Sequence, residues 1–222
     1  VYEKVRRHAP RAKVIFDTVD LHFLRLQREA ELAANAEAIR AAERMKKLEL
    51  DLVRKADATI VLSRFEMDLL RELTPGANLF EIPIVREVPA ASGVPFEERQ
   101  DIVFVGGFEH QPNVDAVQWF VAEVVPQLQA RGFAGRFIVV GSSMPAHIKA
   151  LERPGVVMRG FVQDLEAFFG TIRLSVAPLR YGAGLKGKVI SSLSYGVPVV
   201  ATRVAVEGGG FSDGENVLVA DE

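Results

Sequence analysis

The stretch 177–202 limits what this chain can fold into more than any other part of its 222 residues. It reads as an apolar strand, a glycine-rich basic turn, a helix, a tight turn and a second apolar strand. The turn holds three glycines and three cations: Gly182, Gly184 and Gly187, and Arg180, Lys186 and Lys188. Glycines let the backbone approach a ligand closely, and a helix N-terminus near Gly184 adds oriented N–H groups. The stretch therefore predicts an anion-binding turn at the carboxyl edge of an open α/β sheet.

A P-loop is one interpretation of this turn. Gly182, Gly187 and Lys188 have the spacing of its glycines and lysine. The next residue is Val189, however, where a P-loop needs a Ser or Thr hydroxyl to hold Mg²⁺. No acidic partner for a metal stands out at a later strand end, so the residues favour a different interpretation.

A series of short motifs extends the pattern on both sides of the turn. In chain order they are residues 103–107, 112–116, 139–141, 160–162, 178–188, 196–202, 207–208 and 213–214. Their ordered set resembles the donor-binding domain of GT-B glycosyltransferases, group 1 or family 4-like, in a bacterial branch. This group of retaining enzymes is related to glycogen synthase and sucrose synthase. The resemblance implies transfer of a sugar from a nucleotide sugar to an acceptor.

Strands and helices alternate from Asp101 onward, which predicts a parallel sheet with right-handed crossovers. The fold class that we expect is α/β of the GT-B type. Residues 97–222 would form a doubly wound, Rossmann-like donor domain without its C-terminal end. Residues 89–96, rich in Pro, Ser and Gly, would form a linker. Residues 1–88 would form part of an N-terminal, acceptor-side domain, because residues 16–22, 55–57 and 63 resemble its later half. The chain is thus expected to be a fragment.

Residues 27–55 contain neither Pro nor Gly and predict one long helix. A stripe of apolar residues at steps of three and four is expected to face the core: Ala34, Ala38, Ala41, Met45, Leu48 and Leu52. A coiled-coil partner face is the alternative.

The resemblance implies a set of donor-binding residues: Gly106, Gly107, Arg180, Gly184, Lys186, Ser191 and Glu207. Arg180 and Lys186 would hold the diphosphate, with backbone donors from the Gly184 region. Fixed cations and N–H groups can stabilise the negative charge that builds on a leaving phosphate without a metal. We therefore expect a nucleotide-diphosphate sugar as the donor substrate, no cofactor and no metal.

Two positions depart from the fold class, which often carries glutamates eight positions apart across this loop and helix. The matching residues are Ala183 and Ser191. A serine binds a ribose hydroxyl more weakly than a carboxylate does. The residues after Gly107 also lack the Arg and Lys of many relatives. These departures motivate an alternative, a non-catalytic GT-B-fold binding or scaffold module. A GT-B-like nucleotide-sugar epimerase is a further alternative.

His22 follows a short strand and is the candidate for acceptor contact or proton handling, which would make it catalytic. Its alternative role is a capping or solvent-exposed histidine. Asp17 and Asp20 form an acidic pair without a third ligand, so no metal site is assigned.

Composition limits partners and location. The net charge of −2 gives no support for nucleic-acid binding, and the absence of cysteine excludes disulfides. The expected partners are a nucleotide sugar and a glycan or lipid-linked acceptor. We expect a cytoplasmic protein of cell-surface polysaccharide or glycolipid synthesis. Its parent protein would contact the inner face of the membrane through segments outside this chain.

Overall fold

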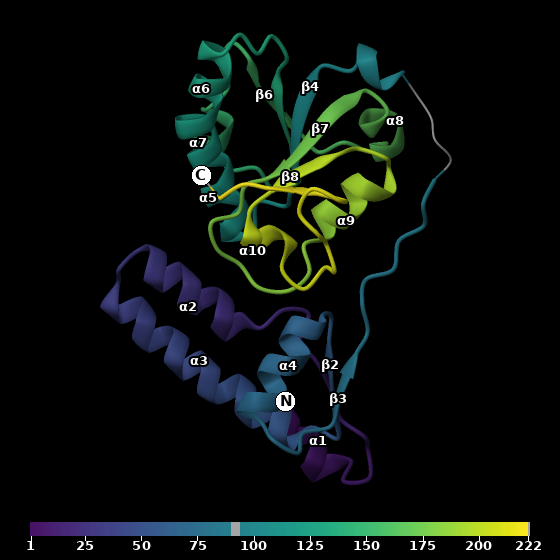
Figure 1. Cartoon of the computed structure of the whole chain (residues 1–222). Coiled ribbons are helices and arrows are strands. Elements are labelled where there is room, and N and C mark those ends of the chain that lie inside the picture. The colour runs from purple at the N-terminus through teal and green to yellow at the C-terminus, as the bar shows by residue number, and fades with distance from the viewer. Residues whose placement is uncertain (90–93, 222) are drawn as a thin grey trace. The chain divides into compact units, whose positions relative to one another are not determined.

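The computed structural model describes residues 1–89 and 94–221. The chain divides into two compact units (Figure 1). The first comprises Val1–Ile84 with Tyr181–Leu185, and the second comprises Val85–Arg180 with Lys186–Glu222. The domain boundaries expected from the sequence, 1–88 and 97–222, stay a prediction. Part of the expected linker, residues 90–93, lies outside the described residues.

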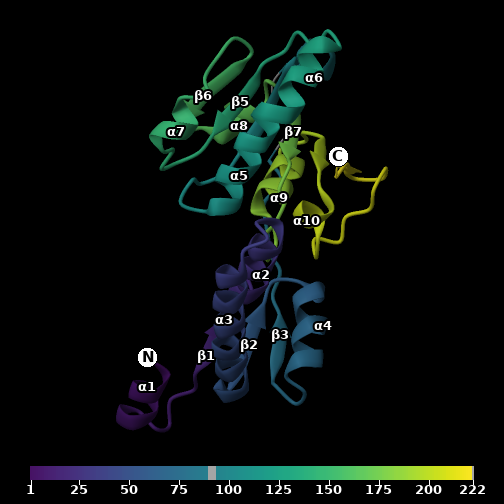
Figure 2. The same cartoon turned by 90° about the vertical axis from the view of Figure 1, so that its left-hand side faces the viewer.

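The first unit is built on a parallel sheet in the order β1-β2-β3. Its strands are β1 (Ile15–Asp17), β2 (Ala58–Val61) and β3 (Leu79–Glu81), and its helices are α1 (Tyr2–His8), α2 (His22–Leu32), α3 (Ala36–Lys55) and α4 (Arg64–Leu73). Helices α2 and α3 run side by side (Figure 2). Its core gathers Leu21, Phe23, Leu50, Val53, Val61, Met67 and Leu70.

The single helix expected over residues 27–55 is wrong, because two helices with a turn between them occupy this region. Ala34 has a left-handed backbone (φ 49°), which ends α2. The Asn35 side chain then accepts from the N–H groups of Glu37 and Ala38 at 2.9 and 3.1 Å and so caps α3. The expected apolar stripe is also displaced: Leu48 is 54% exposed, whereas Ala42, Glu49 and Val53 are buried.

Asn35→Ala is expected to lower the free energy of unfolding of the first unit by about 1 kcal/mol, because two helix N–H groups lose their acceptor. Urea unfolding followed by far-ultraviolet circular dichroism would measure it. Arg40→Ala, an exposed position on the same helix, is the matched control. Equal effects of the two changes would show that the cap does not define this helix start.

The second unit contains a six-stranded parallel sheet in the order β6-β5-β4-β7-β8-β9. The strands are β4 (Asp101–Val105), β5 (Phe137–Val140), β6 (Val156–Gly160), β7 (Ile172–Ala177), β8 (Val199–Ala201) and β9 (Leu218–Val219). The chain adds β5 and β6 on one side of β4 and then crosses to β7 on its other side. The carboxyl edge between β4 and β7 is therefore the point where strand order reverses, which is where such sheets bind ligands.

Helices cover both faces of this sheet (Figure 1). They are α5 (Gln111–Trp119), α6 (Val125–Ala130), α7 (Ala146–Lys149), α8 (Leu165–Phe169), α9 (Gly187–Ser194) and α10 (Arg203–Val206), with a π-helical turn at Phe120–Val124 and a 3₁₀ turn at Phe96–Glu98. Residues alternate between the faces: Phe104 packs in a core with Val117 and Phe120, and Val103 packs with Phe168 and Phe169. The α/β, doubly wound architecture expected from the sequence is confirmed.

Candidate functional site

Two loops meet at the point of strand reversal in the second unit. One is the Gly106–Gly107 turn that follows β4, and the other consists of residues 178–180 after β7 and Lys186 at the start of α9, which belong to the same unit. Because β4 and β7 are hydrogen-bonded neighbours, their carboxyl ends lie side by side. This edge is the candidate site.

The Gly106–Gly107 turn is packed tightly against the end of β5. The N–H of Gly106 donates to the carbonyl of Val140 at 3.0 Å, and the N–H of Phe108 donates to the carbonyl of Ser142 at 3.0 Å. A Cβ atom added at Gly141 would overlap the carbonyl oxygen of Gly106. Gly141 is therefore glycine because backbone of the turn occupies the space of a side chain.

Two consecutive side-chain hydrogen bonds connect the Gly106–Gly107 turn to α9. The amide of Asn113, buried at the start of α5, donates to the carbonyl of Gly107 at 2.7 Å. The ammonium of Lys188 on α9 donates to the Asn113 Oδ1 atom at 2.8 Å. The ammonium also lies 5.4 Å from the ring centroid of Phe104. Burial, with repulsion from Lys186, lowers the pKa of Lys188 to about 7.

Arg180 follows β7 and is paired with a carboxylate of α5. Its Nε atom donates to Asp115 Oδ2 at 2.9 Å, and its Nη2 atom donates to Asp115 Oδ1. The sequence motifs assigned Arg180 to a diphosphate and included Asp115 only as part of the motif 112–116, not as a partner of Arg180. The strand order was the only signal that could have joined residues 65 positions apart. The assignment to a diphosphate stays a prediction.

Helix α9 begins at this edge. Lys186 is its N-cap and is buried, and the N–H groups of Gly187 and Lys188 have no acceptor within the helix. Gly184 has a left-handed backbone (φ 71°), which favours glycine. A helix N-terminus flanked by two lysines presents N–H groups and positive charge to an anion.

Ser191 and Glu207 lie on elements that follow the start of α9 in the chain. Ser191, on α9, lines a hollow of about 440 Å³ together with Arg86, Glu87 and Tyr195. Glu207 follows α10, which begins after β8 with Thr202 as its cap. The structure thus brings Gly106, Gly107, Arg180 and Lys186 to one edge and places the other two on neighbouring elements.

His22 belongs to the first unit and opens α2. Its Nδ1 atom lies 3.2 Å from Asp20 Oδ1 and 3.3 Å from Glu49 Oε1. No sequence pattern pointed to Glu49, a buried carboxylate that accepts from the N–H groups of His22 and Phe23 and so caps α2 from α3. Burial raises the pKa of Glu49. The catalytic role of His22 stays a prediction.

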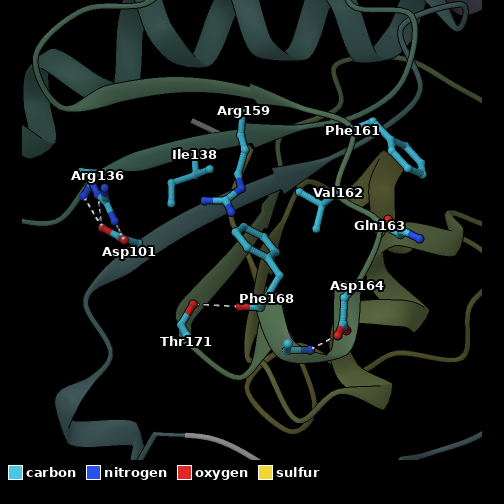
Figure 3. A pocket seen from close by; sticks show the side chains of 11 residues that line it. Asp101, Arg136, Ile138, Arg159, Phe161, Val162, Gln163, Asp164, Phe168 and Thr171 are labelled. Atoms are coloured by element: carbon cyan, nitrogen blue, oxygen red, sulfur yellow. Dashed lines mark hydrogen bonds and ion pairs between the residues drawn. The ribbon is translucent and has the colours of Figure 1, made fainter.

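A larger hollow, of about 550 Å³, lies away from this edge (Figure 3). Arg159 lies over the ring of Phe168 there, 5.4 Å from its centroid, and Arg136 is paired with Asp101 at 2.6 Å. The lining also includes the carboxylate of Asp164, which caps α8, so it holds two guanidinium groups and two carboxylates and favours neither sign of ligand charge.

Over residues 1–89 and 94–221, no three His, Asp or Glu side chains are grouped to hold a metal ion. No helix within the described part of the chain is long and apolar enough to cross a membrane.

The second unit matches a protein family. The model of the family "Glycosyl transferases group 1" matches residues 99–222, which is more than half of the chain. The chain belongs to the group 1 glycosyltransferases. The resemblance drawn from the motifs is thereby confirmed. No curated protein sequence matches this group 1 glycosyltransferase chain.

Solved structures show the same fold. Sucrose-phosphate synthase from Thermosynechococcus elongatus superposes with a TM-score of 0.68 at 20% identity, covering 92% of this chain and 53% of that one. A TarM variant from S. aureus, solved with UDP, α-GlcNAc-glycerol and fondaparinux, gives 0.67 at 18%, covering 81% and 36%. Anabaena HepE, solved with UDP and glucose, gives 0.61 at 15%, covering 95% and 58%. This chain therefore spans about a third to three fifths of these proteins.

Proposed function

We propose that the second unit is the donor-binding part of a glycosyltransferase that moves a sugar from a nucleoside diphosphate sugar to a glycan or lipid-linked acceptor. One observation carries the proposal: the Gly106–Gly107 turn and the N-terminus of α9 meet at the point of strand reversal in a domain of the group 1 family. The UDP in the TarM and HepE structures supports a nucleoside diphosphate as the ligand class.

The chemistry of this edge suits a departing diphosphate. Lys186 and Lys188 supply positive charge, and the first N–H groups of α9 supply fixed donors. Such groups stabilise negative charge without rearranging during the reaction. Retention of anomeric configuration, independence of a metal and a cytoplasmic role in cell-surface polysaccharide or glycolipid synthesis, at the inner face of the membrane, are parts of this proposal.

A non-catalytic binding module is the second candidate. Ala183 and Ser191 replace acidic residues of the fold class, and Arg180 is engaged by Asp115. Both features reduce the groups that a donor sugar could use. Turnover of any nucleotide sugar by the protein would exclude this candidate.

Lys186→Ala is expected to weaken binding of the cognate nucleoside diphosphate about 10- to 100-fold, because a charged donor at the start of α9 is lost. Calorimetric titration with UDP, GDP and ADP would name the base and measure the loss. Lys149→Ala, an exposed lysine on α7, is the matched control and is expected to bind like the unaltered chain. If the folded, unaltered chain bound none of the three nucleotides, that result would contradict the donor site.

A further inference from the structure

Lys188 is an unusual lysine because its ammonium has no carboxylate partner among residues 1–89 and 94–221. Its one hydrogen bond among the described residues goes to the Oδ1 atom of Asn113, a neutral amide. Phe104 lies beside it, and the charge that acts on it is the like charge of Lys186. Enclosing an unpaired ammonium opposes folding, and an apolar or amide side chain would fill this position at lower free energy. A role other than packing is therefore needed to explain a lysine here.

The hydrogen bonds that start at Lys188 end on the Gly106–Gly107 turn. Asn113 holds the carbonyl of Gly107, and the carbonyl of Ser142 holds the N–H of Phe108. Both sides of the peptide group between Gly107 and Phe108 are thus fixed. The N–H of Gly106 donates to the carbonyl of Val140, whereas the N–H of Gly107 has no acceptor among the described residues.

We propose that Lys188 and Asn113 are positioning residues of the donor site, which hold the Gly107 N–H ready for a phosphate oxygen, and that Lys188 takes up a proton when the diphosphate binds. This inference rests on the proposed donor site. It assigns to a half-buried lysine both the shape of the turn and a dependence of donor binding on pH.

The charged and titratable groups around Lys188 come from three elements. Lys186 is the N-cap of α9, Asp115 lies on α5 with His110 as the N-cap of that helix, and Arg180 follows β7. Asp115 is engaged by Arg180, and only Lys186 contributes a charge effect on the Lys188 ammonium. A bound diphosphate would bring several negative charges to the turn and favour the charged ammonium. Affinity should then fall as the pH rises above 7, where the free protein loses this proton.

The first experiment tests the shape of the turn without any ligand. Hydrogen exchange at the Phe108 amide is measured in the unaltered chain and in Asn113→Asp, Lys188→Met and Lys149→Met. Asn113→Asp keeps an oxygen for Lys188 but places another against the Gly107 carbonyl. Both site variants are expected to exchange about tenfold faster at Phe108 than the unaltered chain, and Lys149→Met is expected to be unchanged. Unchanged exchange in both site variants would overturn the positioning role.

The second experiment tests the proton. Calorimetric titration of UDP, GDP and ADP in buffers of different ionisation enthalpy counts the protons taken up between pH 7.5 and 9. The unaltered chain is expected to take up about half a proton and to bind roughly tenfold more weakly at pH 9 than at pH 7. Lys188→Arg stays charged throughout and is expected to show no uptake and a nearly flat profile. Lys149→Arg is the control.

The two proposals fail in different ways. A folded chain that binds none of the nucleotides overturns the donor site and this inference with it. Binding whose proton uptake survives Lys188→Arg overturns the inference alone, since the nucleotide and His110 are then its source.

Discussion

Gly141→Ala is expected to lower the free energy of unfolding of the second unit by about 3 kcal/mol or more. The added Cβ atom would overlap the carbonyl oxygen of Gly106, which is backbone and cannot rotate away. Relief requires separation of the β4 and β5 ends, with loss of the bond from the Gly106 N–H to Val140. The chain has a single tryptophan, Trp119 on α5, so urea unfolding followed by its fluorescence reports on this unit.

Gly107→Ala is the matched control for this prediction. A Cβ atom there meets the Ser142 hydroxyl oxygen at 3.6 Å, an ordinary contact, and the backbone is not left-handed. We expect a change of less than about 1 kcal/mol. Similar losses in the two variants would show that general sensitivity of the turn, and not the overlap with Gly106, sets the effect.

Much of the second unit could be predicted from local patterns. Strands β4 and β5 are apolar at successive positions, which indicates strands buried on both faces. Alternation with helices then gives a parallel sheet. The first unit was harder to predict from local patterns. The buried face of α3 includes Glu49, because this carboxylate caps α2. Apolar periodicity does not predict a buried carboxylate.

The residues that shape the site could be predicted only in part. The glycines and lysines of residues 177–202 mark an anion-binding turn by themselves. Their hydrogen-bond partners could not be predicted in this way. Asn113 lies 75 positions from Lys188, and Asp115 lies 65 positions from Arg180. Strand order brings them together, and strand order depends on long-range pairing that no local pattern encodes.

Lys188→Met is expected to stabilise the second unit by about 1–3 kcal/mol at pH 6, because it removes an ammonium that is shielded from water and has no carboxylate partner in the described part of the chain. Methionine has a similar length and an adaptable apolar side chain. The gain is limited because Asn113 loses a donor to its Oδ1 atom, a loss of about 1 kcal/mol.

The sign of the pH dependence follows from the lowered pKa. Lys188 titrates at about 7 in the folded chain and at roughly 10.4 when unfolded. Between these values the unfolded chain binds more protons, so the unaltered protein gains stability from this site as the pH rises. Lys188→Met lacks this dependence. Its advantage should therefore be full below pH 7 and should shrink toward pH 9.5.

Urea unfolding followed by Trp119 fluorescence at pH 6 and pH 9.5 measures the gain in stability and its dependence on pH. Lys149→Met, at an exposed position, is the control and is expected to change stability by less than about 0.5 kcal/mol. A constant difference between Lys188→Met and the unaltered chain at the two pH values would show that the ammonium is not enclosed as described. A variant that is more stable yet binds nucleotide more weakly would instead mark a residue kept for function against the stability of the fold. That combination separates a site lysine from a packing residue, since loss of a packing residue would weaken stability and binding together.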